Sequence, residues 1–220
     1  WSGLFAILAV VTMTVGNMMA LSQSNIKRLL GYSTIAQAGY ILVGLASVPA
    51  NQVGATFAGA GPQGVMYYLA GYVFTNLAVF FAVIAITART NDDSIKGLNG
   101  MLKRSPLLAG LLVFGLLSLL GMPPTVGFMA KVVVFGSAVN ANLTWLALIG
   151  VVNTVIAAYY YLRVIRAIVF EDPADESTFS ADKPVLVAAG VAAVGAGVFG
   201  LAPFLLLEFA ESALSIIPGL

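Results

Sequence analysis

The sequence contains no cysteine and no histidine. These absences exclude disulfide bonds, thiolate or imidazole metal ligands, histidine-ligated haem and cysteine-ligated iron–sulfur clusters. Charged residues are also scarce, at 9% of the 220 residues, whereas a soluble domain carries about 25%. The formal net charge is only +1, which gives no indication of nucleic-acid binding. The composition is therefore that of an integral membrane protein.

Hydrophobic residues make up 60% of the chain, and they fall into apolar runs of about 20 residues separated by short polar segments. This pattern predicts an all-α membrane protein rather than a β-barrel. Ser24 or Asn25 is expected to cap the second helix and Asp182 the sixth. The six expected transmembrane helices cover residues 4–21, 29–48, 65–88, 106–138, 143–162 and 184–209.

Apart from Lys131, basic residues fall only on alternate connections between these helices. They occur at 27 and 28, from 89 to 104 and from 163 to 183, whereas the loops 49–63 and 136–144 have no charge. The positive-inside rule places the basic connections in the cytoplasm or its equivalent, and both ends of this chain outside. The acidic residues from 171 to 176 lie on the same inner side and weigh little in this rule.

The longest apolar run, from Pro106 to Ala138, contains a Pro-Pro pair with glycines on both sides. Each proline removes a backbone donor and clashes with the preceding helical turn, and residues before proline avoid the helical region. Gly121, Pro123, Pro124 and Gly127 therefore predict an unwound link between two half-helices. A single straight helix of roughly 33 residues would span about 50 Å, although the hydrocarbon core is only about 30 Å thick.

Lys131 is the only charged residue in this broken run. A lysine inside a membrane is unfavourable and is by default a candidate functional residue. Burial favours the neutral amine over the ammonium, so Lys131 is a candidate proton carrier. The alternative is a lysine near a helix end that extends its ammonium to the membrane surface.

Uncharged polar side chains inside the expected helices form a second group of candidates. Hydrogen bonds between helices are their usual role, and lining a hydrated path is the alternative. The group comprises Asn17, Gln37, Thr75, Asn76 and Asn153. We select Gln37, together with Ser118 and Thr125 beside the break, as candidates for lining such a path.

Two further patterns have a structural interpretation. Tyr159, Tyr160 and Tyr161 beside Arg163 are typical of an aromatic belt at the membrane surface. Small residues recur every fourth position at 188, 192, 196 and 200, which allows another helix to approach closely. That helix belongs either to this chain or to a partner subunit.

Motifs of enzymatic catalysis are missing. The sequence has no nucleotide-binding glycine loop, no nucleophile with a histidine base, and no pair of carboxylates inside an expected helix. The chemistry that remains is the handling of protons or cations.

Three segments resemble motifs of one family. They are NIKRLLGYSTIAQAGY at 25–40, LSLLGMPPTVGFMAK at 117–131 and YYYLRV at 159–164. These segments are similar to the antiporter-like membrane subunits of NADH-quinone oxidoreductase (respiratory complex I), and most of all to the subunit N branch. The resemblance runs over nearly the whole chain and is weakest after Glu171.

The resemblance implies a fold of two inverted five-helix repeats, each with a broken helix and a key lysine. Residues 1–170 would form the second repeat, 171–183 an acidic cytoplasmic loop, and 184–220 a closing transmembrane helix and tail. Because the first residue is Trp1 rather than methionine, we expect the first repeat in a preceding part of a longer protein. Lys131 would match the proton-transferring lysine of the second repeat. Many relatives have histidine in place of Gln37, and a glutamine there can only form hydrogen bonds.

The resemblance also implies a function. The chain would be a non-redox, proton-translocating subunit of NADH:quinone oxidoreductase, with no cofactor of its own and with FMN, iron–sulfur clusters and quinone in partner subunits. Those partners would be sister antiporter-like subunits and small membrane subunits in a bacterial inner membrane, a thylakoid or another energy-coupling membrane. Two alternatives stay open: a subunit of a multisubunit Na⁺/H⁺ antiporter or membrane hydrogenase, and a structural subunit that does not pump.

Overall fold

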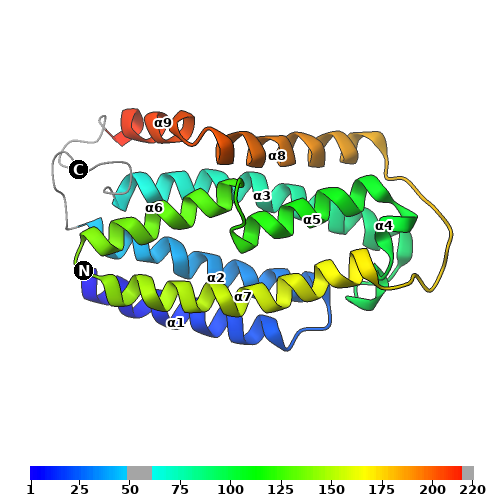
Figure 1. Ribbon diagram of the computed structural model, residues 1–220, viewed down its shortest axis with the longest axis horizontal. Helices are drawn as coiled ribbons and strands as arrows, with labels where there is room; N and C mark the ends of the chain where they lie inside the picture. The colour runs from blue at the N-terminus through cyan, green and yellow to red at the C-terminus, as the bar shows by residue number, and fades with distance from the viewer. Residues whose placement is uncertain (49–60, 215–220) are drawn as a thin grey trace.

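The computed structural model describes residues 1–48 and 61–214, and the long helices of this part of the chain lie side by side (Figure 1). The elements are α1 (Ser2–Leu21), α2 (Ile26–Ala46), α3 (Gly61–Thr90), the short 3-10 turn η2 (Lys96–Leu98), α4 (Met101–Arg104), α5 (Pro106–Leu120), α6 (Val126–Asn140), α7 (Thr144–Phe170), α8 (Lys183–Leu201) and α9 (Phe204–Leu214).

Five of these helices, α1, α2, α3, α7 and α8, are long and apolar enough to cross a membrane. The shorter apolar helices α5 and α6 follow each other along one line in Figure 1 and supply the remaining passage. The expected all-α membrane fold with a broken fourth passage is therefore confirmed.

Several helix ends differ from the sequence prediction by two to four residues, and two differ by eight. The fifth helix, expected to end at residue 162, continues to Phe170, because Arg163 and Arg166 mark the end of the apolar run and not of the helix. The sixth was expected to continue to residue 209, but α8 ends at Leu201. The cause is Pro203, which has no N–H to continue the helix. The apolar residues beyond it form the separate helix α9.

The expected helix caps are partly confirmed. Asn25 accepts a hydrogen bond at Oδ1 from the backbone N–H of Arg28, at 3.0 Å, and so caps α2. Asp182 does occupy the capping position of α8, but its side chain makes no capping bond. Its carboxylate instead accepts a hydrogen bond from Arg89 at 3.2 Å.

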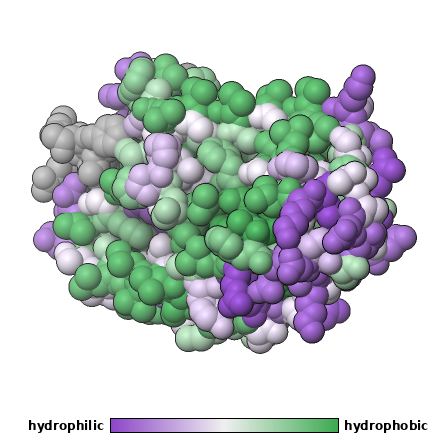
Figure 2. All heavy atoms as spheres, turned by 45° about the vertical axis from the view of Figure 1, so that its right-hand side comes forward, coloured by the Kyte–Doolittle hydropathy of each residue, from purple (hydrophilic) through white to green (hydrophobic). Residues whose placement is uncertain are grey.

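Hydrophilic side chains gather at the end of the bundle that carries α4 and the α7–α8 connection (Figure 2). Ion pairs link the loops there, and they are Lys27–Asp93, Arg89–Asp182, Lys103–Asp172, Arg104–Asp175 and Arg166–Glu171. Arg163 donates to the carbonyls of Leu21 and Gln23 at the end of α1. The basic connections thus share one side of the molecule, as the positive-inside rule requires.

Two large apolar clusters fill most of the interior, and a third, small one consists of Ala78, Ala192 and Ala193. The large cluster nearer the charged end includes Ile26, Leu30 and Leu98, and the other large cluster includes Met13, Tyr67 and Val134. The small-residue face of α8 is also turned inward, because Ala192, Ala196 and Gly200 are buried. It packs on helices of this same chain, as one of the two alternatives expected.

Candidate functional site

The site begins with two backbone carbonyls at the end of α5. In an α-helix, the carbonyl of residue i accepts from the N–H of residue i+4. A continuous helix would therefore pair Leu119 with position 123 and Leu120 with position 124. Both positions are proline and have no N–H. The backbone N–H groups of Gly121 and Met122 do not replace these donors, because they bind the carbonyls of Leu117 and Ser118, which lie earlier in α5.

Lys131 binds both of these carbonyls. Its Nζ donates to the carbonyl oxygen of Leu119 at 3.0 Å and to that of Leu120 at 2.7 Å. Nζ also lies 5.1 Å from the centre of the Tyr40 ring. The C-terminal end of a helix carries partial negative charge, and an aromatic face attracts cations. The ammonium therefore lies where both the backbone and the ring attract it.

The Lys131 side chain is only 6% exposed, so it does not extend to the membrane surface. In the described part of the chain, none of the ion pairs includes this lysine. Its hydrogen-bond acceptors there are the two carbonyls of the neighbouring half-helix. Lys131 belongs to α6 and its acceptors to α5, so the side chain connects the two halves of the broken passage.

The glycines around the break allow this close approach. Gly121, which ends α5, has a φ angle of 93°, a conformation that glycine adopts without steric cost. Gly127, in the first turn of α6, lies against the carbonyl of Ser118, and a Cβ at this position would overlap that oxygen. The sequence analysis identified both glycines as helix breakers. Their second role, bringing α6 against the end of α5, requires the three-dimensional structure.

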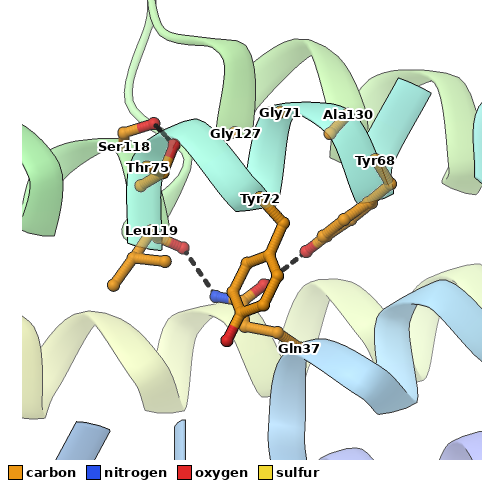
Figure 3. A pocket seen from close by; sticks show the side chains of 9 residues that line it. All are labelled: Gln37, Tyr68, Gly71, Tyr72, Thr75, Ser118, Leu119, Gly127 and Ala130. Atoms are coloured by element: carbon orange, nitrogen blue, oxygen red, sulfur yellow. Dashed lines mark hydrogen bonds between the residues drawn. The ribbon is translucent and has the colours of Figure 1, made fainter. Parts of the chain in front are cut away.

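Gln37 shares an acceptor with Lys131. Its Nε2 donates to the Leu119 carbonyl at 3.1 Å, and its Oε1 accepts from the hydroxyl of Tyr68 (Figure 3). Nε2 also lies 3.4 Å from the hydroxyl of Tyr161, which is hydrogen-bonded to Ser33. Gln37 therefore connects the lysine site to a buried set of hydroxyl groups from α2, α3 and α7.

A small cavity lies beside these groups. It has room for roughly one water molecule, and Figure 3 shows Gln37, Tyr72 and the hydrogen-bonded pair Thr75 and Ser118 along its wall. Of the three path candidates, Gln37 and Ser118 line this cavity. Thr125 is not among the lining residues: its hydroxyl donates to the carbonyl of Met122 at 2.6 Å and closes the turn of the link.

A second polar cluster surrounds the hydroxyl group of Tyr40. The amide of Asn17 donates to the Tyr40 hydroxyl and to Oδ1 of Asn153, both at 3.1 Å. The Tyr160 hydroxyl donates to Oδ1 of Asn17 at 3.0 Å. These bonds join α1, α2 and α7, so Asn17 and Asn153 have the interhelical role that is usual for such residues.

The sequence analysis missed the buried tyrosines. It assigned Tyr159, Tyr160 and Tyr161 to a belt at the membrane surface, but only Tyr159 is exposed, at 64%, and the other two are buried. A usable signal was present. Tyr160 follows Asn153 by seven residues, so the two share one helix face, and a polar residue inside a span indicates the buried face.

The comparisons with known proteins identify the family. The family model described as NADH:quinone oxidoreductase/Mrp antiporter, transmembrane, matches residues 1–157. The chain belongs to this family. It is 41% identical over 217 residues to NADH-quinone oxidoreductase subunit N from Dehalococcoides mccartyi and 42% identical over 220 residues to that from Trichlorobacter lovleyi.

These alignments cover 99% of this chain but only 44% and 43% of the relatives. The chain therefore spans less than half the length of the curated relatives that it matches. The expected resemblance to complex I subunit N is confirmed, and so is the multi-pass membrane character. Among the described residues, no group of three or more acidic, histidine or cysteine side chains could hold a metal ion.

Solved structures agree on the fold. A chain of respiratory complex I from Thermus thermophilus with bound aureothin aligns with a TM-score of 0.77 and 30% identity, over 94% of this chain and 45% of that one. The Mrp complex from a Dietzia species aligns with a TM-score of 0.84 at 21% identity, over 97% of this chain and 46% of that one. This second match supports the antiporter-like fold alone.

Proposed function

We propose that this chain is part of a proton-translocating membrane subunit of a bacterial NADH:quinone oxidoreductase. The observation that carries the proposal is the buried Lys131, bound to the two carbonyls that Pro123 and Pro124 leave without helical donors. The family membership and the similarity to subunit N support the assignment to this complex. The membrane would be the bacterial inner membrane.

In this proposal, the carbonyls of Leu119 and Leu120 stabilise the protonated form of Lys131, because they accept hydrogen bonds from its Nζ. A neutral amine is a weaker donor than an ammonium, so loss of the proton weakens the hold on both carbonyls. Because the link is already unwound, the lysine moves without breaking a helix. Moving one charge against a potential near 200 mV requires about 4–5 kcal/mol, which the electron transfer in partner subunits would supply.

Partner subunits would hold the redox groups. The chain offers no histidine or cysteine to bind haem or iron–sulfur clusters. Iron–sulfur clusters would therefore belong to other subunits. The similarity to subunit N supports placing FMN and quinone in other subunits as well, with sister antiporter-like subunits adjoining this one in the membrane. Residues 1–170 would form the second five-helix repeat, 171–183 an inner loop, and 184–220 the closing segment.

The test is purification of the whole assembly from native membranes, followed by NADH:quinone activity and proton uptake in liposomes. Lys131→Met is compared with the wild type and with Lys103→Met, whose target side chain is 66% exposed and paired with Asp172 at the charged end. We expect flavin and iron–sulfur proteins to copurify, and only Lys131→Met to lose proton uptake. Purification without redox partners would favour a Na⁺/H⁺ antiporter subunit. Unimpaired uptake in Lys131→Met would make the lysine structural.

A further inference from the structure

The structure contains a second helix break beside the first. In Figure 1, α8 gives way to α9 at the same level along the bundle as the link between α5 and α6. α8 ends at Leu201, and Pro203 precedes α9. Both helices lie beyond residue 157, where the match to the family model ends.

Gly200 brings the two breaks into contact. A Cβ at this position would overlap the carbonyl oxygen of Pro124, the carbonyl carbon of Thr125 and the amide nitrogen of Val126. All three atoms belong to the backbone of the link and its junction with α6, so no flexible side chain could move aside. The last turn of α8 therefore lies directly on the link, and only glycine allows this approach.

Tyr67 fixes the end of α8 against α3. Pro203 leaves the carbonyl of Phe199 without its helical donor, because proline has no N–H. The Tyr67 hydroxyl donates to this carbonyl at 2.6 Å. The Phe199 ring also packs on Phe74 of α3, with 5.2 Å between ring centres. At each break, proline thus leaves carbonyls without a helical donor. In each case a side chain from another helix donates a hydrogen bond to them.

We propose that the end of α8 is a brace that holds the α5–α6 link in the position Lys131 requires, with Gly200 and Tyr67 as positioning residues. The link is held at both of its ends. Lys131 binds the carbonyls of Leu119 and Leu120 just before it, and Gly200 packs on the backbone of Pro124 and Thr125 just before α6. An unwound link without such support would sample many conformations, and the carbonyls of Leu119 and Leu120 would no longer be held for the lysine.

The experiment uses the assembled membrane complex with the full-length polypeptide, and compares variants in matched pairs. Gly200→Ala adds a methyl group against the link, whereas Gly190→Ala adds one on the same helix where nothing lies within 4 Å. Tyr67→Phe removes the hydroxyl that binds Phe199, whereas Tyr159→Phe removes one from a side chain that is 64% exposed. Lys131→Met is included because the functional part of this inference rests on the proposed function.

Two quantities are measured: hydrogen exchange of the amides at 121–128 by mass spectrometry, and protons translocated per electron in liposomes. We expect Gly200→Ala and Tyr67→Phe to speed exchange in the link on the order of tenfold and to lower the proton-to-electron ratio. The two controls should match the wild type in both measurements. Should Gly200→Ala fail to assemble, Tyr67→Phe decides.

Wild-type exchange rates in Gly200→Ala or Tyr67→Phe would overturn the brace. Faster exchange with an unchanged proton-to-electron ratio would overturn its positioning role. If Lys131→Met itself kept the full ratio, the proposed function would fail, and the exchange rates would still decide whether α8 holds the link.

Discussion

Lys131 and Gln37 donate to the same backbone oxygen, the carbonyl of Leu119, at 3.0 and 3.1 Å. One residue carries a charge, and the other belongs to a set of buried hydroxyl groups on α2, α3 and α7. A change in the position of the lysine therefore changes the hydrogen bonding of the glutamine as well. This shared acceptor is the most direct connection between the charged group and the polar interior of the bundle.

Replacing Lys131 by arginine should separate charge from proton transfer. Arginine keeps its proton at any physiological pH, and it can donate to the carbonyls of Leu119 and Leu120. We expect Lys131→Arg to assemble with near wild-type thermal stability and to lose proton translocation. Lys131→Met should also lose proton translocation and should be less stable, because the buried carbonyl of Leu120 is left without its donor at a cost of about 1–3 kcal/mol, whereas Leu119 keeps the bond from Gln37. Normal translocation with arginine would contradict a proton-carrying role.

Removing the amide of Gln37 should weaken the site without removing its charge. Gln37→Leu takes one donor from the Leu119 carbonyl and the acceptor from the Tyr68 hydroxyl, a loss of about 1–3 kcal/mol in unfolding free energy. Thermal unfolding and proton uptake of the purified complex measure both effects. Gln23→Leu, at the charged end, is the control. Its side chain makes only exposed hydrogen bonds, to the Met19 carbonyl and the Ser22 hydroxyl, so stability should fall less than in Gln37→Leu and proton uptake should stay at the wild-type value.

Restoring a titratable group at this position should make translocation depend on pH. Histidine changes charge between about pH 5 and 8, and a cation at position 37 would lie beside the same carbonyl as the Lys131 ammonium. We expect proton translocation by Gln37→His to fall as pH decreases through this window, relative to the wild type. Identical pH profiles for the two proteins would show that position 37 does not influence the lysine.

Adding one methyl group at Gly127 should separate the half-helices. Its Cβ would overlap the Ser118 carbonyl, and such overpacking costs about 1–3 kcal/mol. Gly110→Ala is the matched control, because nothing lies within 4 Å of a Cβ there, and alanine in a helix interior is favoured over glycine by about 0.5–1 kcal/mol. Thermal unfolding should therefore shift in opposite directions for the two variants, and equal shifts would contradict the close packing.

Acid should release the α7–α8 connection from the charged end. The hydrogen bond from Lys103 holds the pKa of Asp172 below its ordinary value of 3.8, and hydrogen bonds from Ser177 lower the pKa of Asp175 in the same way. A lowered folded-state pKa stabilises the structure above the unfolded value, and this stabilisation disappears as pH falls below about 4. Limited proteolysis with an acid-stable protease should show faster cleavage at 171–182 below that pH.

The sequence was sufficient for the membrane passages and the break, because both depend on local properties. Hydrophobic runs define the passages, and Pro123 and Pro124 exclude a regular helix wherever they occur. Counting four residues back from each proline also identifies Leu119 and Leu120 as the carbonyls that lose their donors. Pro203 is a signal of the same kind for the end of α8, but apolar residues continue on both sides of it, so a boundary placed by hydropathy alone falls too late in the sequence.

The partners of the site depended on the tertiary structure. Gln37 and Lys131 are far apart in sequence, and no local pattern places them on one carbonyl. The same holds for Tyr68 and Tyr161, whose hydroxyls meet Gln37 from two other helices. Thr125 is polar and adjacent to the break, but its sequence position does not show which way its hydroxyl points. In the structure the hydroxyl donates to the nearby Met122 carbonyl and does not line the cavity.

The lysine lies on one half-helix and its acceptors on the other, so under the proposed function the proton of Lys131 would also determine how firmly the two halves are joined. A membrane voltage would then act on the ammonium as a force between α6 and α5. The charge state of the Lys131 side chain would then change the distance between α5 and α6. The broken passage would couple electrical force to shape, because the link between the two half-helices lacks the helical hydrogen bonds that would resist such a movement.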